Sequence, residues 1–312
     1  QDIWRHIHLL LPLRDAARAA CVCRAFLCLW RNRPSLIFSN KTLGLNESGR
    51  GKDEIARDFT SIVDHILKKH LGTGLKTLKL LNAPKKYKFP SSILSHGNGD
   101  SLRYLFLDEC AFHPTVGIGC LRNLARLDLF SVYIKGNELG CFLSNSLALE
   151  SLDLRYCCEI RCVKIPWLQQ LTHLSVTGCS KLQVIESKAP KLSSFDFDRD
   201  HQVQISLGET LHVKKLYIDC SGPICHSRAE LAHSMPNLES IGIYSSSEIV
   251  NPSLASRKFL YLECLDITLR GLTFSQSFDF SSMVSSPSLK TFIFDVSCLY
   301  PSHSNNHGGT VN

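Results

Sequence analysis

The sequence lacks a hydrophobic run long enough to cross a membrane. Its longest apolar candidate, IHLLLPL around Leu10, is short and is interrupted by Pro12, whereas a membrane span needs roughly 18 apolar residues. A secretory signal peptide is also missing. The chain starts at Gln1 instead of Met, so we expect it to be a fragment. These features predict a protein without a membrane partner.

Motifs of the common catalytic sites are lacking as well. The chain holds no G-x-x-x-x-G-K-[ST] phosphate loop, no H-E-x-x-H zinc motif and no G-x-S-x-G nucleophile motif. Its 13 histidines are scattered. We therefore predict a protein that is not an enzyme and that needs no cofactor. A hydrolase would require distant residues to converge in the fold.

The 14 cysteines show no ligand spacing where they are densest. Cys157, Cys158 and Cys162 lie within six positions, yet they form no C-x-x-C pair and their loop holds no histidine. We predict neither a metal site nor a disulfide there. So many cysteines without a secretory signal indicate reduced thiols, and hence a protein of the cytoplasm or nucleus.

One short string recurs from Leu75 to the end of the chain: apolar, two variable, apolar, one variable, apolar. It appears as LKTLKL, LRYLFL, LARLDL, LESLDL and further variants, in about ten copies. The first residues of the copies lie at positions 75, 102, 124, 149, 171, 192, 213, 238, 262 and 289. Their intervals of 21 to 27 residues match the leucine-rich repeat, whose period is about 20–29 residues.

The repeat predicts a stack of short strands. The last four residues of each copy alternate apolar and polar, so each copy is a strand with one buried face, and stacked copies share one core. We expect an α/β leucine-rich-repeat solenoid. Cys110, Cys157 and Cys179 each follow the third apolar residue of a copy by three positions, where the chain turns off the strand. The cysteines are thereby explained by the repeat.

The first 38 residues have a helical period instead. Ile3, Ile7, Leu10 and Leu11 form one helical stripe that ends at Pro12, and two further short helices are expected before residue 38. Residues 1–45 carry seven basic and two acidic residues, a net charge of +5. So small a head has a poor core of its own and should need a partner or the first repeat to cover it. It could also be only a cap on the solenoid.

The head resembles an F-box in the segments DIWRHI, LLPLRDAARAACVCRAF and LW. It departs from the F-box pattern in lacking the opening leucine–proline, in having Phe26 where tryptophan is commoner, and in its many cysteines between Cys21 and Cys28. The resemblance implies docking on a Skp-type adaptor of a cullin–RING ubiquitin ligase. The residues implied to contact the adaptor are Ile3, Ile7, Leu11, Pro12, Leu13, Val22, Cys23 and Trp30.

The whole chain is similar to plant F-box/leucine-rich-repeat proteins. We expect an F-box at residues 1–45, a linker with an amphipathic helix at 46–74, repeats at 75–300 and a disordered tail at 301–312. The resemblance implies a substrate-recognition subunit of a Skp–cullin–F-box ubiquitin ligase. Two alternatives stay open: an interaction scaffold without a ligase link, and a ligand-dependent co-receptor.

The variable strand positions should face the concave surface. They hold eight aspartates and only four basic residues, namely Lys79, Arg126, Arg155 and Lys215. An acidic, aromatic-bearing face favours a basic protein segment over nucleic acid, unless the aspartates are only solvated spacers. The predicted substrate-binding residues are Tyr104, Phe106, Asp108, Asp128, Phe130, Asp153, Asp196, Asp198, Tyr217 and Asp219.

Overall fold

The computed structural model divides the chain into two compact units, residues 1–213 and 214–312, and each is described by itself. The residues that it describes are 2–45, 49–70, 74–84, 87–94, 99–114, 121–198, 203–208, 210–220, 234–245, 259–270, 284 and 286–297. None of the helices in these ranges is long and apolar enough to cross a membrane.

The first unit opens with three short helices, α1 (Asp2–Leu10), α2 (Leu13–Ala20) and α3 (Arg24–Arg31). Pro12 separates the first two helices and stands at the N-cap of α2. At the start of α3, the Cys23 thiol accepts a hydrogen bond from the Phe26 N–H at 3.5 Å. Val22 lies in the turn before this helix and not inside it.

Arg33 ties these helices to the rest of the unit. Its buried guanidinium donates to the backbone carbonyls of His8, Leu9 and Leu11 at 3.2, 3.0 and 2.8 Å, which occupies acceptors at the end of α1. The Arg33 carbonyl in turn lies 3.0 Å from Nε2 of buried His70. His70 directly follows α5 (Lys52–Lys69), so one polar chain links α1 to α5.

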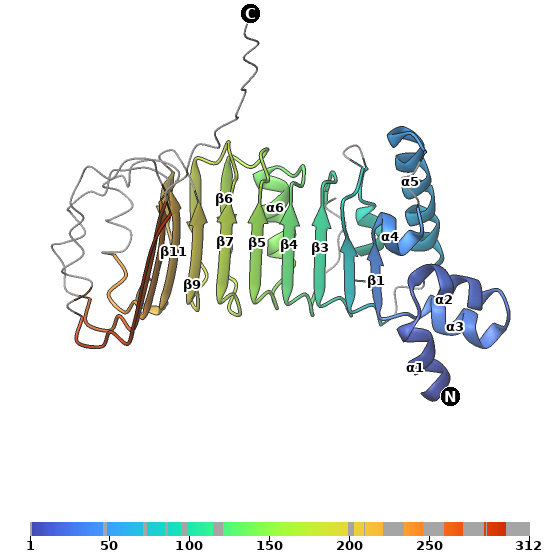
Figure 1. The fold of residues 1–312 in the computed structure, drawn as a ribbon, viewed down its shortest axis with the longest axis horizontal. Helices are drawn as coiled ribbons and strands as arrows, with labels where there is room; N and C mark the ends of the chain where they lie inside the picture. Colours follow the sequence, from blue (N-terminus) through green and yellow to red (C-terminus); the bar gives the residue numbers. More distant parts are fainter. Residues whose placement is uncertain are drawn as a thin grey trace, which may run out of the picture. The chain divides into compact units, whose positions relative to one another are not determined.

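Helix α5 buries one face, with Ile55, Phe59, Val63 and Ile66 spaced by three and four residues. It lies within residues 46–74, where the sequence predicts a linker with an amphipathic helix. The short helix α4 (Asn40–Leu43) precedes it, and Figure 1 shows both at the end of the sheet where the chain begins.

The core of the first unit is a parallel sheet in the order β1-β2-β3-β4-β5-β7-β9. Leucines at the same place in neighbouring strands pair in register, as in Leu105, Leu127 and Leu152, and they are fully buried. Figure 1 shows these strands side by side. Their bounds are β1 (Ser35–Phe38), β2 (Thr77–Leu80), β3 (Tyr104–Asp108), β4 (Arg126–Phe130), β5 (Ser151–Arg155), β7 (His173–Thr177) and β9 (Ser194–Asp198).

The leucine-rich-repeat solenoid is therefore present, but its start and count differ from expectation. β1 was not among the predicted copies, yet it pairs with β2, so the sheet begins at Ser35 rather than at Leu75. Six of the ten predicted copies form strands of this sheet in the first unit, and β1 adds a seventh strand. The second unit has its own parallel strands, β11 (Lys215–Cys220), β12 (Ser240–Ser245), β13 (Cys264–Arg270) and β14 (Thr291–Ser297). The predicted tail at 301–312 lies outside the described residues.

A left-handed residue follows each of the strands β2, β3, β4, β5 and β7. Asn82, Glu109, Ser131, Tyr156 and Gly178 have φ between 49° and 64°, and each lies seven positions after the first residue of its copy. This conformation is unfavourable for any residue except glycine. It turns the chain so that the next residue, which is Cys110, Cys157 or Cys179 in three copies, enters the core.

The connections on the other side of the sheet contain few helices in the described ranges. They include η1 (Ser91–Leu94), η2 (Thr210–His212), α6 (Gly136–Ser144) and a small parallel sheet in the order β10-β8-β6. Its strands are β6 (Cys162–Ile165), β8 (Val184–Ser187) and β10 (Gln204–Ser206). Helix α6 approaches β6 closely: a Cβ added at Gly136 would clash with the Cys162 carbonyl oxygen.

Candidate protein-interaction surface

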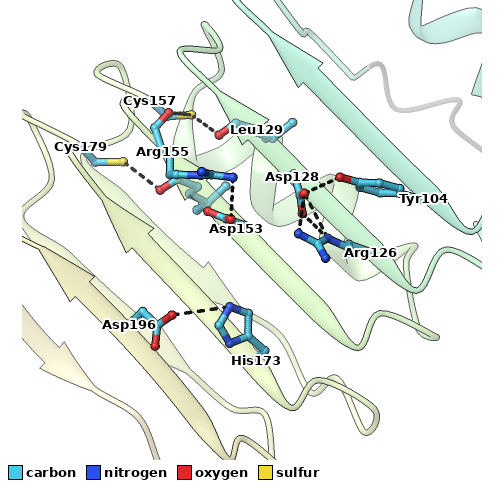
Figure 2. Close-up of polar contacts among 11 residues, drawn as sticks. Tyr104, Arg126, Asp128, Leu129, Asp153, Arg155, Cys157, His173, Cys179 and Asp196 are labelled. Carbon is cyan, nitrogen blue, oxygen red and sulfur yellow. Dashed lines mark hydrogen bonds and ion pairs between the residues drawn. The ribbon is translucent and has the colours of Figure 1, made fainter. Parts of the chain in front are cut away.

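The concave positions of β3, β4 and β5 bring charged and aromatic side chains together. In register, Tyr104 pairs with Arg126, Phe106 with Asp128, and Asp128 with Asp153. Figure 2 shows the polar contacts among these residues and their neighbours on β7 and β9. We call the surface formed by Tyr104, Arg126, Asp128, Phe130, Asp153, Arg155 and Tyr156 the concave cluster.

Asp128 is the buried centre of this cluster. It accepts hydrogen bonds from the Tyr104 hydroxyl at 2.7 Å and from Arg126 Nε at 2.9 Å, and Arg126 Nη2 lies 2.9 Å away (Figure 2). The Asp128 side chain is 3% exposed, whereas that of Arg126 is 51% exposed. Burial, and then the bond to Asp128, raise the pKa of Tyr104 to about 12. The carboxylate thus orients two groups that lie nearer to solvent.

Asp153 holds Arg155 in the same way on the next strand. Their side chains form an ion pair at 3.0 Å, with exposed fractions of 14% for the carboxylate and 40% for the guanidinium. The buried Oδ1 of Asp153 has no hydrogen-bond partner in the described residues. Burial raises the pKa of Asp153, although Arg155 opposes the shift.

Asp196 is two strands further on, where His173 of β7 approaches it at 3.8 Å (Figure 2). Burial raises the pKa of Asp196, and the interaction with His173 opposes this. Asp153 pairs in register with Ser175, and Ser175 with Asp196. Asp128 and Asp153 thus lie on adjacent strands, and Asp196 lies two strands beyond Asp153.

The expectation of an acidic concave surface is wrong for β4 and β5. The sequence gives the number of aspartates but not their depth. Asp128 and Asp153 lie beneath the arginines that they bind, so a partner would meet guanidinium groups and aromatic rings there. Asp128 and Asp153 are also not merely solvated spacers, because each carboxylate forms an ion pair with an arginine.

Aromatic side chains complete the cluster. Phe130 and Tyr156 make an edge-to-face contact with centroids 5.2 Å apart, and the Arg155 guanidinium lies 5.7 Å from the Phe130 ring. Lys79 and Arg126 lie 4.6 and 5.2 Å from the Tyr104 ring. These are the residue types that dominate binding energy at protein interfaces.

Tyr156 was missed in the sequence because it lies one position beyond the strand pattern. It is exposed and left-handed, with φ of 55°. Its ring also reaches the next repeat, since a Cβ added at Gly178 would clash with it. The regular offset from the leucines was the signal that could have identified it. A bulky residue held in this conformation is a candidate for function.

The remaining predicted substrate residues are spread more widely. Asp108 is buried and accepts the Asn82 N–H at 2.9 Å, so it holds the turn after β2 rather than facing a partner. Phe106 is half-buried between Tyr104 and Asp108 on β3, and Asp198 is half-buried at the end of β9. Tyr217 and Asp219 lie on β11 in the second unit, outside the cluster described here.

The head residues predicted to contact an adaptor divide into two groups. Ile3, Ile7, Pro12, Val22 and Cys23 are exposed, with Ile3 at 74% and Val22 at 80%, and Leu11 is half-buried. Leu13 and Trp30 are 6% and 8% exposed, because they pack inside the head. These two residues do not belong to the exposed surface that holds Ile3, Ile7 and Val22.

The repeat cysteines act as backbone donors. The Cys157 thiol donates to the Leu129 carbonyl at 3.5 Å, and the Cys179 thiol donates to the Leu154 carbonyl at 3.8 Å, so each thiol reaches the preceding strand (Figure 2). Cys179 and burial raise the pKa of Cys157, and burial raises that of Cys110 to about 12. Within the described ranges, no three histidine, cysteine or acidic side chains gather in a way that could hold a metal ion.

Comparison with known proteins agrees with the repeat architecture. The model of the At1g61320/AtMIF1 leucine-rich-repeat domain matches residues 41–309. The match covers most of the chain and leaves the helices α1 to α3 outside. No curated protein matches the sequence.

Proposed function

The chain belongs to the At1g61320/AtMIF1 leucine-rich-repeat family, and from this premise we propose that it holds a target protein on its concave cluster. We further propose that the head docks a Skp-type adaptor, which would make the chain a non-catalytic substrate receptor of a cullin–RING ubiquitin ligase in the cytoplasm or nucleus. The two halves of this proposal rest on different surfaces and are tested separately.

The observation that carries the first half is the oriented arginine pair beside half-buried aromatic rings. Arg126 and Arg155 are each fixed by a buried carboxylate and each lies over a ring, of Tyr104 and Phe130 respectively. A fixed guanidinium loses little side-chain entropy when it binds, so its contacts contribute more of their energy to affinity. The parallel sheet beneath supplies a rigid support.

The second half is supported by the apolar surface of the head. Ile3, Trp4, Ile7, Leu10 and Val22 are all exposed large apolar residues within 20 positions of one another. So many large apolar side chains left exposed in one short segment favour an interaction site. Together with the F-box-like segments and the basic charge, it favours an acidic adaptor that covers α1 and the turn before α3.

The target half is tested by affinity capture with the proteasome and neddylation blocked. Tyr156→Asn keeps a residue that tolerates the left-handed backbone, and it removes the ring. We expect this variant to lose targets that the wild type retains, whereas Tyr133→Asn, a matched change at an exposed tyrosine outside the cluster, should retain them. Retention of the same partners by both folded variants would refute a role for the concave cluster.

The adaptor half is tested with purified Skp-type adaptor and the full chain. Ile7→Asp places a charge on the exposed stripe and should cost several kcal/mol of binding, since that charge would be desolvated without a partner. The control is Ile37→Asp at an exposed isoleucine on β1. Wild-type binding by Ile7→Asp would contradict the F-box assignment.

A scaffold without a ligase link is the second candidate. The observation that favours it is the start of the family match at residue 41, after the three helices. On that view α1 to α3 only cap the solenoid, and target capture persists while neither Ile7→Asp nor the wild type binds the adaptor.

A further inference from the structure

A groove of about 730 Å³ separates helices α2 and α3 from α4 and α5. It differs from the proposed adaptor surface, because Ile3, Ile7 and Val22 do not line it. Leu13 and Trp30, which the F-box pattern had assigned to adaptor contact, line this groove instead. Nothing in the proposed function uses it.

The floor of the groove is apolar. Ala17 and Ala20 of α2 lie in its wall, and their small side chains leave room between the helices. The larger floor residues come from all four helices and are Leu13, Leu27, Trp30, Leu43, Ile62 and Ile66.

The rim of the groove is cationic. The described residues that line it include Arg14, Arg18, Arg31, Lys69 and His65. No aspartate or glutamate is among the described residues that line the groove. Arg14 lies against Gly44, where an added Cβ would be 2.5 Å from its Nη1. One exposed carboxylate, that of Asp15, is near, at 3.9 Å from Arg18. The groove therefore presents a net positive charge above an apolar floor.

We propose that this groove binds a single-chain amphiphile with an anionic head group, of the class of long-chain carboxylates. Small-molecule pockets measure roughly 300–1,000 Å³, and the groove falls within this range. The apolar chain would cover the floor, and the carboxylate would accept charge-assisted hydrogen bonds from the rim. An acidic amphipathic helix of a partner protein is the rival occupant, which the experiment separates.

The test uses the full chain and a fluorescent undecanoate probe below its micelle concentration. Unlabelled decanoate, dodecanoate and tetradecanoate compete with the probe. Each buried methylene contributes about 0.8 kcal/mol, so we expect affinity to rise by about fourfold per methylene while the chain still fits. Dodecanol and dodecylamine should compete at least about tenfold more weakly than dodecanoate, because they lack the anion.

Two matched pairs of variants locate the binding. Ala17→Leu narrows the groove, whereas Ala19→Leu changes a residue of the same helix that does not line it. Lys69→Glu reverses a rim charge, whereas Lys68→Glu makes the same change at a neighbouring exposed position outside the groove. We expect Ala17→Leu and Lys69→Glu to weaken the affinity for the probe at least about tenfold, and we expect the controls to leave that affinity unchanged. Circular dichroism checks that each variant is folded.

Three outcomes would overturn the proposal: no saturable probe binding by the folded chain, equal competition by dodecylamine, or equal weakening by both members of each pair. Saturable binding of an acidic helical peptide without any binding of the probe would assign the groove to a protein partner. None of these outcomes touches the adaptor or target proposals, which are measured on other residues.

Discussion

The helical head and the strands β3 to β5 distribute apolar and charged side chains in opposite ways. In the strands the leucines are fully buried and the surface charges are held in pairs such as Asp128 with Arg126. In the head Ile3, Leu10 and Val22 are exposed, while Arg33 and His8 are buried. The strands bury their own apolar side chains because each repeat covers its neighbour. The head leaves apolar side chains exposed, and for this reason we propose that it depends on a partner.

The two regions also differ in how charge affects their stability. Burial, and then Arg33, lower the pKa of His8, and burial lowers that of His70. Burial raises the pKa of Asp153 and Asp196. Both effects disfavour the charged form, but they give opposite dependences on pH, since one group gains charge on protonation and the other loses it.

The largest expected effect is the loss of stability when a buried leucine is removed from the strands. Leu152→Ala removes a fully buried side chain at the centre of the sheet and should lower the free energy of unfolding by about 2–5 kcal/mol. Urea unfolding of the full chain measures this. Ile3→Ala, at an exposed position of α1, should change it by less than about 0.5 kcal/mol in the absence of adaptor. Equal effects would contradict the contrast between the regions.

A smaller effect is expected from the buried carboxylate. Asp128→Ala leaves the Tyr104 hydroxyl without its acceptor and should cost about 1–3 kcal/mol. The pKa of Tyr104, raised to about 12 by burial and Asp128, should fall towards its ordinary value of 10.0. Ultraviolet titration of the phenol follows this shift. An unchanged Tyr104 titration in the folded variant would show that Asp128 does not orient the ring.

A change of Asp128, Asp153 and Asp196 to lysine would test folding before it could test target binding. A lysine at position 128 would lie buried next to Arg126, without a partner. Salt-dependent target association is better probed at Arg126 and Arg155, whose side chains are exposed and can be changed to glutamine.

The dependence of stability on pH also distinguishes the head from the strands, and its expected effect is smaller. The folded head favours neutral His8 and His70, so the unfolded chain binds more protons below the ordinary pKa of 6.5. The stability contributed by neutral His8 and His70 should therefore be present above this pH. It should be lost as the pH falls through the lowered pKa values of the two histidines. Unfolding followed by Trp4 and Trp30 fluorescence, in a Trp167→Phe background, measures this from about pH 7.5 to about pH 5.5. His8→Leu should flatten the dependence, and an unaltered slope would contradict the assignment.

The strand carboxyls should act in the opposite direction at lower pH. Because the pKa values of Asp153 and Asp196 are raised, their unfavourable contribution appears as the pH rises from the ordinary 3.8 through the raised values. Asp196→Asn should remove part of this dependence, and its reference is the wild type over the same pH range. A dependence of the same sign in head and strands would refute this account.

The repeat could be predicted from its leucines because burial by stacking imposes a fixed spacing on the sequence. That spacing placed Cys157 and Cys179 in the core and set the register of Asp128 and Asp153, which the structure confirms. β1 could not be found in this way, since SLIF is a single strand with no preceding copy. Tyr156 was missed because the left-handed turn moves its ring out of the strand alternation and onto the concave surface.

The sequence by itself determined that apolar residues at a fixed interval would stack into a solenoid, and that the chain would begin with short helices, which extend to Arg31. Only the tertiary structure decided which charges face a partner. Asp128 and Arg126 are two positions apart and look equivalent in the string, yet one is buried and the other exposed. The reason is length: the short carboxylate remains near the sheet, where Tyr104 from the neighbouring strand can reach it, while the long guanidinium extends over both.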